Sequence, residues 1–325
     1  MLNRRFLGVA LAFAILGSAI SFAAAQDYPN RAVRIMIGPS SDVTARLMAD
    51  RLHAAMGQPV IVENRPGGGG EVAAKTVAAA EPDGHTLLYA TSSYTLSTAL
   101  HLATYDFVKE FEPVALFGIS SFTLVVHPSV QAKNLQELIA LAKEKPGQLN
   151  CASSGLGTPP HLGCEMLNAM AGIRLVHVPF RNVNEAVNSL LGGHVQMLFS
   201  VSINARAAVQ SGALRAIAIT TPKQSGLMPN VPTMEESGLP GFIITGWGAI
   251  VAPAGTPAAV TGRLSKEIQT LLRDPVVSDR IVQSGQEPSG VETPQQFREF
   301  IKSDIDRWNR LIDLTGVKRG KSEAK

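Results

Sequence analysis

The chain has 325 residues, of which 45% are apolar, and carries a formal net charge of +3 at pH 7. This length is enough for two domains, each with a buried core. Such a small net charge gives no basic field of the kind that attracts nucleic acid or anionic lipid, so no nucleic-acid partner is expected.

Residues 1–25 have the composition of a secretory signal. Arg4 and Arg5 give a positive start, residues 6–22 are almost wholly apolar, and three alanines at 23–25 fit a cleavage site. The apolar stretch is short for a membrane span of ~20 residues and ends in alanines, which disfavours an uncleaved anchor. We therefore predict an exported, soluble protein that begins at Gln26.

Extended and helical runs alternate in the first part of the mature chain. The predicted strands are 33–37, 60–63 and 86–91, and the predicted helices are 42–56 and 71–80. Asp42 is placed to cap the first helix, and Arg46 follows four residues later for a supporting ion pair. Such a βαβαβ opening favours a parallel sheet covered by helices on both faces.

The glycine-rich stretch "NRPGGGGEVAAKT" follows a strand and opens a helix, as a dinucleotide-binding turn does. The acidic residue that would bind the ribose is missing, because the next strand ends in Tyr89-Ala90-Thr91-Ser92. A Walker phosphate loop is excluded because Lys75 lacks the glycine that should precede it. We interpret the stretch as a turn that lets strand and helix pack closely, and no cofactor is predicted.

A second series of the same kind follows. The predicted strands are 122–128, 149–153, 175–179, 195–199, 214–221 and 243–253, and the predicted helices are 135–144, 160–171, 184–191, 257–272 and 293–312. Two similar α/β units joined by two extended crossings are the expected architecture.

The stretch "ASSGLGTPPHLGCEML" at 152–167 predicts a binding turn. Ser153 and Ser154 end a strand, glycines permit a tight turn, and Thr158 starts a helix whose first amides have no internal partner. Free amides, hydroxyls and the positive end of a helix dipole together favour a carboxylate. Residues 38–42 repeat this layout, so the two turns are expected to face each other across a cleft. Either turn alone is also typical of a simple connector.

Three residues near this turn leave alternatives open. His161 lies in the first turn of the helix, where it could contact a ligand or serve packing or capping. Cys151 and Cys164 could form a disulfide in an oxidising compartment or stay inert buried thiols. A zinc site is excluded because no second ligand pair completes the spacing of His161 and Cys164.

The sequence contains neither of two common catalytic motifs. No serine has a Gly-x-Ser-x-Gly setting, and no His-x-x-x-His pair is present. The chain is therefore not expected to be an enzyme.

Several stretches in fixed order carry a resemblance to a known family, the Bug/TctC periplasmic solute-binding proteins of tripartite tricarboxylate-type uptake systems. They include "YPNRAVRIMIGP" at 28, "GQPVIVENRPGGGG" at 57, "AAEPDGHTLLYATSS" at 79, "CASSGLGTPPHL" at 151, "HVPF" at 177, "LLGGHVQMLF" at 190, "LRAIAITT" at 214, "VPTMEESGLPGF" at 231 and "APAGTP" at 252. The resemblance covers nearly the whole mature chain and is specific because the order of the pieces is shared.

The resemblance implies a two-domain α/β periplasmic binding protein fold of type II. Each domain would be a mainly parallel sheet flanked by helices, and two strands would cross between the domains. The expected division gives residues 26–121 and 249–325 to the first domain and 122–248 to the second, with crossings near 122–127 and 243–251. A small organic carboxylate would be enclosed in the cleft by amides, hydroxyls and water, without Arg or Lys.

Carried over residue by residue, the resemblance gives a set of expected ligand contacts. They are Gly38, Pro39, Ser40, Ser41, Asp42, Thr91, Ser92, Ser93, Ser153, Ser154, Gly157, Thr158, His161, Phe180, Asn182, Ser200 and Ser202.

Two departures from the family pattern bear on the ligand. The first turn of the family normally runs Pro-x-Pro-Pro-Gly-Gly-x-x-Asp, whereas here only residues 38–41 separate Ile37 from Asp42. The shorter turn either widens the pocket or weakens carboxylate binding. Ser200 stands where many relatives place an Asp, which removes a partner for a ligand amine. A dicarboxylate or an aromatic carboxylate therefore fits better than an amino acid.

The resemblance implies a periplasmic monomer that delivers its ligand to the permease subunits of a tripartite tricarboxylate-type transporter. A ligand-presenting sensor subunit for a receptor kinase is the main alternative, since it would bind in the same way. A secreted hydrolase is a weaker one.

Overall fold

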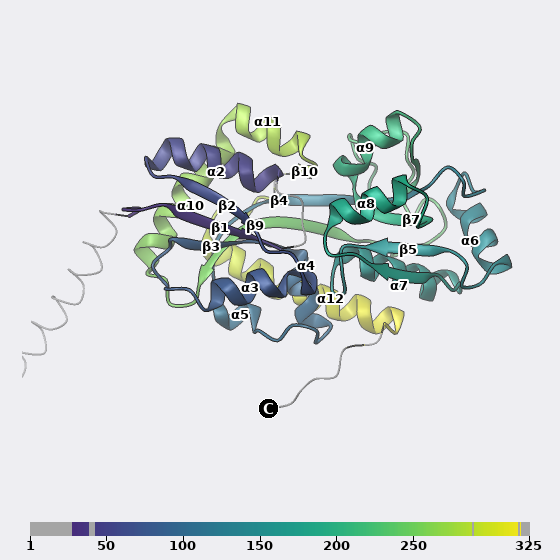
Figure 1. The fold of residues 1–325 in the computed structure, drawn as a ribbon, viewed down its shortest axis with the longest axis horizontal. Coiled ribbons are helices and arrows are strands. Elements are labelled where there is room, and N and C mark those ends of the chain that lie inside the picture. The colour runs from purple at the N-terminus through teal and green to yellow at the C-terminus, as the bar shows by residue number, and fades with distance from the viewer. Residues whose placement is uncertain (1–27, 39–42, 288, 318, 320–325) are drawn as a thin grey trace, which may run out of the picture.

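Two lobes lie side by side along the longest axis of the molecule in the computed structural model (Figure 1). The structure describes residues 28–38, 43–287, 289–317 and 319. The expected signal at 1–25 and four of the expected ligand contacts, Pro39, Ser40, Ser41 and Asp42, lie outside these ranges. Within the described chain, no helix has the length and apolar character needed to cross a membrane.

One ten-stranded sheet runs through both lobes. Its strands are β1 (Val33–Ile37), β2 (Val60–Asn64), β3 (Thr86–Thr91), β4 (Phe111–Val126), β5 (Asn150–Ser153), β6 (Val176–Pro179), β7 (Met197–Val201), β8 (Arg215–Ile219), β9 (Thr245–Pro253) and β10 (Gln286–Glu287). The outer pairs, β1 with β2 and β3 and β5 with β6 and β7, are parallel, as expected for α/β units.

The long strand β4 joins the lobes. Residues 111–121 of this strand pair antiparallel with β9, and β10 pairs at Ile119 and Ser120. Residues 122–126 pair with β7 and β8. Strands β4 and β9 are antiparallel because the chain passes out along β4 and returns along β9. The change of partner falls at 121/122.

Helices cover both faces of each lobe (Figure 1). They are α2 (Val43–Met56), α3 (Glu71–Ala78), α4 (Ser92–Ala99), α5 (Phe107–Glu110), α6 (Leu135–Glu144), α7 (Pro159–Ala171), α8 (Val183–Leu191), α9 (Ser202–Gln210), α10 (Ala258–Arg273), α11 (Pro275–Gln283) and α12 (Pro294–Thr315), with a 3-10 turn, η1, at Gly68–Gly70.

The alternation of side chains along β1 explains the layers of the first lobe. Ile35 and Ile37 pack in the cluster that contains α2, α10 and α11, whereas Met36 packs in the cluster on the opposite face with α3 and α12. All three are buried, because a strand covered on both faces points successive side chains into different cores.

The second lobe has the same plan, with α6 and α7 on one face and α8 and α9 on the other (Figure 1). Helix α12 belongs to both lobes. Its residues Phe297 and Ile301 pack in the core of the first lobe, and Trp308 and Ile312 pack in that of the second. The C-terminal helix therefore spans the junction and is not confined to the first domain.

The predicted strands and helices are found within a few residues of their expected bounds. Four helices and one strand were not predicted: α4, α5, α9, α11 and β10. The strand expected at 122–128 is the second-lobe end of β4, which starts at Phe111.

Candidate functional site

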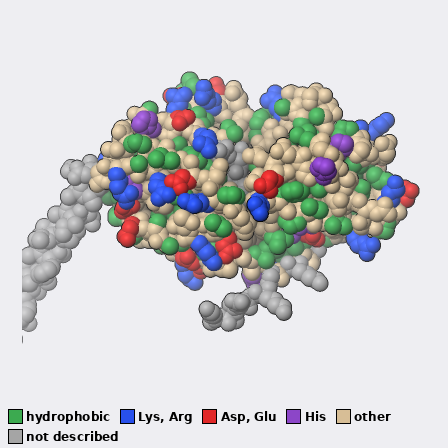
Figure 2. Space-filling model, in the orientation of Figure 1, with side chains coloured by type: hydrophobic (Ala, Val, Ile, Leu, Met, Phe, Trp, Pro, Cys, Tyr) green, Lys and Arg blue, Asp and Glu red, His purple; other side chains and the backbone are tan. Residues whose placement is uncertain are grey.

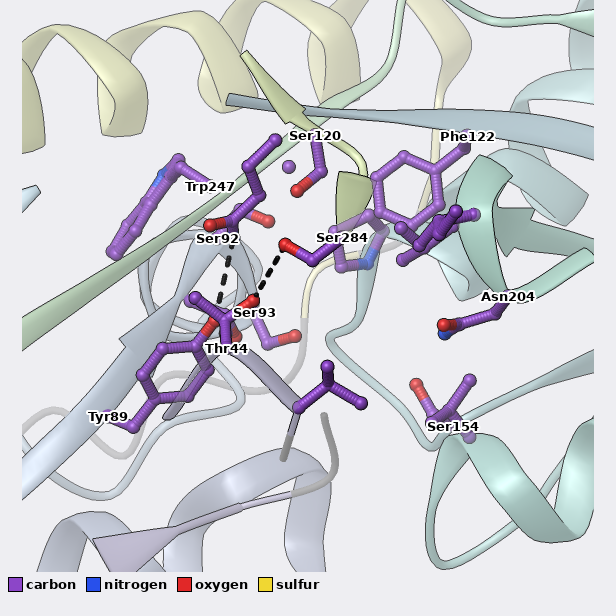
Figure 3. A pocket seen from close by; sticks show the side chains of 18 of the residues that line it. Thr44, Tyr89, Ser92, Ser93, Ser120, Phe122, Ser154, Asn204, Trp247 and Ser284 are labelled. Carbon is purple, nitrogen blue, oxygen red and sulfur yellow. Dashed lines mark hydrogen bonds between the residues drawn. The ribbon is translucent and has the colours of Figure 1, made fainter. Parts of the chain in front are cut away.

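A cavity of about 540 Å³ lies between the lobes. This volume is within the range of roughly 300–1,000 Å³ that small-molecule sites occupy. Residues of both lobes line the cavity, and their side chains face each other across it (Figure 3).

Hydroxyl groups dominate the wall that the first lobe contributes. They belong to Thr44, Tyr89, Thr91, Ser92, Ser93, Ser120 and Ser284. Thr44 lies in the first turn of α2, Thr91 ends β3, and Ser92 and Ser93 begin α4. Because the carboxyl ends of parallel strands and the starts of the following helices meet at one edge of the sheet, segments far apart in sequence deliver hydroxyls to one place.

Apolar side chains dominate the wall of the second lobe. They belong to Phe122, Pro159, Pro160, Val183, Phe199, Val201 and Ile203. Ser154 and Asn204 are the polar groups on this side, opposite Ser93 and Thr44 in Figure 3. The cavity therefore has one wall that hydrogen-bonds and one that packs.

Among the described residues, the charged side chains that line the cavity are exposed. Asp50 and Arg280 are the charged residues among those that line it, and both are exposed. On the face shown in Figure 2, basic and acidic side chains are interspersed without a field of one sign. The described lining therefore offers an anion in the interior dipoles and hydroxyls and no buried side-chain cation.

Helix starts supply these dipoles. Helices α4, α7 and α9 begin at the cavity, and the side chains of their N-cap residues Thr91, Thr158 and Val201 make no capping hydrogen bond. The first amides of an uncapped helix lack partners, and the dipole makes this end positive. Three helix starts meet at one cavity, one from the first lobe and two from the second; α4 and α9 offer free amides, and α7, which begins with two prolines, offers its dipole, so together they favour an anion.

Side-chain caps close other helix starts. Asp106, Asn134, Asp274 and Thr293 accept hydrogen bonds from the first amides of α5, α6, α11 and α12. Asn182, an expected ligand contact, caps α8 in the same way: its Oδ1 accepts a hydrogen bond from the Glu185 amide. The Asn182 side chain is therefore engaged in the helix it starts.

Two residues that line the cavity each have a buried polar atom without a hydrogen-bond partner in the described chain. These atoms are Oγ1 of Thr91 and Oε1 of Gln286. Gln286 is 5% exposed, and its Nε2 makes a long hydrogen bond of 3.5 Å to Tyr89 Oη. Burial raises the pKa of Tyr89 to about 12, so the phenol stays protonated.

The second-lobe turn, residues 153–158, is stabilised by hydrogen bonds from its own side chains. Ser153 Oγ lies 2.6 Å from His177 Nε2 and bonds the backbone of Gly155. Thr158 Oγ1 donates to the Gly155 carbonyl at 2.7 Å. The Gly157 amide donates to Nδ1 of His161 at 3.3 Å, so this side chain contacts the turn from within the helix.

His161 and His177 form a neutral pair. Their ring centroids are 4.5 Å apart. Burial, and for His161 also the neighbouring ring of His177, lowers the pKa of each to about 4. A neutral pair fits the hydrogen bond that His161 accepts.

Cys151 and Cys164 form a disulfide. Their Cα atoms are 6.0 Å apart, within the span that a disulfide bridges. The alternative of two inert thiols is therefore wrong. The bridge joins β5 to α7 on either side of the turn.

Glycines bring the two lobes into backbone contact beside the cavity. A Cβ atom on Gly69 would collide with the Leu156 carbonyl, and one on Gly155 would lie 3.5 Å from the Gly69 amide nitrogen. Gly69 has φ 66°, which a side chain also disfavours. The glycine-rich turn of the first lobe thus touches the binding turn of the second.

Four of the expected ligand contacts line the cavity: Thr91, Ser92, Ser93 and Ser154. The others that the structure describes do not line it. Gly38 packs against Tyr94 and Gly70, Ser200 Oγ donates to the Val201 carbonyl, and Ser202 Oγ bonds Ser121 and Thr123. The remaining ones are Ser153, Gly157, Thr158, His161, Phe180 and Asn182.

Sequence reasoning missed the contribution of α11 and β10. Arg280, Gln283, Ser284 and Gln286 line the cavity, yet they follow no binding motif. The helix itself had a signal, because Asp274 caps it and Pro275 fills its first position. Nothing local indicates that the next strand pairs with β4 and turns Gln286 toward the site.

Two α/β lobes that enclose a ligand-sized cavity and share crossing strands form the two-lobed fold of periplasmic binding proteins. A profile described as "Tripartite tricarboxylate transporter family receptor" matches residues 44–317. The chain belongs to this family, the Bug/TctC receptors.

Known relatives resemble the chain over nearly its full length. Protein BugT of Bordetella pertussis is 34% identical over 319 residues, 96% of this chain and 97% of that protein. The structure titled "R. palustris Rpa4515 with adipate" has a TM-score of 0.85 at 28% identity and covers 89% of this chain and 99% of its own. MatC from Rhodopseudomonas palustris with bound malate has a TM-score of 0.83 at 29% identity, with 88% and 100% covered.

Proposed function

We propose that this protein captures a small organic anion, a dicarboxylate or an aromatic carboxylate, in the cavity and delivers it to a tripartite tricarboxylate-type membrane transporter. The observation that carries the proposal is the meeting of three uncapped helix starts from both lobes at one cavity without a buried side-chain cation. Adipate and malate, named in the titles of two structural neighbours, are carboxylates.

The proposed contacts differ between the lobes. Ser92 and Ser93 offer hydroxyls and the first amides of α4. Helix α7 begins with Pro159 and Pro160, which have no amide hydrogen, so it acts mainly through its dipole, and the start of α9 near Asn204 supplies amides. A carboxylate between these starts is held by many modest terms of about 1 kcal/mol each, some through water.

Binding is coupled to closure of the lobes. A ligand that contacts both walls stabilises the closed arrangement relative to the open one, so it shifts the population toward closure. The closed form then docks on the permease. In this proposal Ser153, Thr158 and His161 support the second-lobe turn.

Isothermal titration calorimetry against dicarboxylates and aromatic acids tests the binding step. Saturable binding of at least one of them is expected, and the absence of any response would remove the proposal. Deletion of the gene tests the transport step: uptake of the bound acid should be lost, whereas intact uptake with a lost transcriptional response would indicate a sensor subunit.

A further inference from the structure

A polar corner is defined by four residues that line the cavity on the side of the first lobe: Thr44, Tyr89, Ser284 and Gln286. They come from α2, β3, the residue after α11, and β10. Thr44, Tyr89 and Ser284 lie together in Figure 3, across the cavity from Asn204 and Ser154.

The hydrogen bonds of this corner are incomplete. Thr44 Oγ1 and Ser284 Oγ pair at 3.1 Å, and the Gln286 amide nitrogen reaches the Tyr89 phenol at 3.5 Å. Oε1 of Gln286 has no partner in the described chain, although the side chain is 95% buried. A buried acceptor without a donor is unfavourable, so a ligand group that donates a hydrogen bond here would complete the corner.

The same oxygen argues against a second carboxylate at this point. A carboxylate has no hydrogen to donate, and the charged residues that line the cavity, Asp50 and Arg280, lie exposed at the rim. A hydroxyl group supplies the missing donor without a second buried charge. Oε1 is shielded from solvent in this arrangement, and a hydroxyl, which both donates and accepts, can pair with the amide when it turns about its last, broad torsion.

The opposite wall favours a flat apolar body. Phe122 and Phe199 line it from the second lobe, and Trp247 lies beside Ser92 at the junction of the lobes (Figure 3). Aromatic rings pack on one another in offset or edge-on arrangements, which a planar ligand can adopt.

We propose that the ligand is a monocarboxylate whose aromatic ring carries a hydroxyl group; this inference rests on the proposed carboxylate-binding function. The carboxylate lies at the uncapped helix starts, the ring packs on Phe122 and Phe199, and the hydroxyl donates to Gln286 Oε1 in the polar corner.

Calorimetry with matched acids tests this assignment on the unaltered protein. The pairs are benzoate with 4-hydroxybenzoate, and 3-phenylpropanoate with 3-(4-hydroxyphenyl)propanoate, with adipate and malate measured alongside. In at least one pair the hydroxylated acid should bind tenfold or more tightly than its parent, and more tightly than either diacid.

The Gln286→Leu variant locates the preference in the polar corner. The hydroxylated acid should then bind the variant within about twofold of its unhydroxylated parent acid. Gln283→Leu, the same change at an exposed lining residue three positions earlier, should leave the advantage intact.

The outcomes separate this inference from the proposed function. Equal affinities within both pairs, tighter binding of adipate or malate, or an advantage that survives in Gln286→Leu would overturn the assignment while the protein remained a carboxylate receptor. Failure of every acid to bind would instead remove the proposed function. The matched acids decide the question without a variant if Gln286→Leu does not fold.

Discussion

The two strand-to-helix turns at the cavity are built from similar residues but use them differently. In the first lobe, β3 passes directly into α4, and Thr91, Ser92 and Ser93 all line the cavity. In the second lobe, a glycine turn of residues 154–158 separates β5 from α7. Within this turn, Ser154 is the residue that lines the cavity, and the lining continues with the two prolines that begin α7. The hydroxyl-bearing residues line the cavity in one turn, and the hydroxyls brace the backbone in the other.

The first-lobe turn is therefore expected to contact the ligand, and the side chains of the second-lobe turn to hold its backbone in place. Changes in the first-lobe turn should alter affinity with little effect on folding. Changes behind the second-lobe turn should alter stability first.

A negative charge in the first-lobe turn should have the largest effect. Ser93→Asp places a carboxylate at the start of α4, where the ligand carboxylate is expected. Two like charges about 5 Å apart at an effective dielectric constant of about 20 repel by about 3 kcal/mol, so affinity for an organic acid should fall more than a hundredfold. Calorimetry measures the loss.

Ser93→Asn is the matched control, because it has the size of Asp without the charge. It should lose far less affinity than Ser93→Asp. Equal losses in the two variants would show that steric fit and not electrostatics governs this turn.

Removal of the disulfide should have a comparable effect, but on stability. The double variant Cys151→Ala/Cys164→Ala releases a loop with a sequence separation of 13 residues, for which chain entropy predicts a loss of about 3 kcal/mol. Urea unfolding measures this change. An unchanged free energy of unfolding would contradict a bracing role for the bridge.

Acidification should weaken the second-lobe turn through its histidine pair. The pKa values of His161 and His177 are lowered from about 6.5 to about 4, so between these pH values the unfolded chain binds protons that the folded protein does not. Stability should therefore fall as the pH drops from 6.5 to 4, by on the order of 2 kcal/mol after allowance for solvent screening. Urea unfolding across this range gives the slope.

The double variant His161→Gln/His177→Gln removes both titrating groups. Its unfolding free energy should change less steeply with pH than that of the parent protein. The same slope in both proteins would assign the pH dependence to other groups.

A change at the contact between the lobes should have the smallest effect on ligand affinity. Gly69→Ala adds a methyl group against the Leu156 carbonyl and should hold the lobes apart, with an expected loss of affinity of about tenfold, or ~1.4 kcal/mol. Gly172→Ala is the matched control: this glycine also has positive φ, 61°, but no atom within 4 Å of the added group. Both variants should lose similar stability, and a loss of affinity in both would contradict a specific role for the contact.

The regular elements could be predicted because their apolar periodicity reports burial directly. The strand at Val33–Ile37 and the helix at Leu135–Glu144 were predicted at their observed bounds. Helix α4 was not predicted because its sequence, SSYTLSTA, is rich in Ser and Thr. The helix is buried almost all round, so it has no apolar stripe on one face.

The site was predicted less completely, for a related reason. Residue type indicated a surface rich in hydroxyls and amides, and Thr91, Ser92, Ser93 and Ser154 do line the cavity. Which hydroxyl faces inward depends on tertiary partners: Ser153 bonds His177, and Ser202 bonds Ser121 and Thr123. Gln286 could not be found from sequence, because its place depends on a two-residue strand that pairs with β4 far from it in the chain.

The most direct measurement is a crystal structure of the protein with its tightest-binding organic acid. The account predicts a carboxylate between the lobes, with oxygens about 2.7–3.2 Å from amides or hydroxyls at the start of α4 and facing the helix starts of the second lobe. A carboxylate bound chiefly by an Arg or Lys side chain, or a ligand outside this cavity, would contradict it.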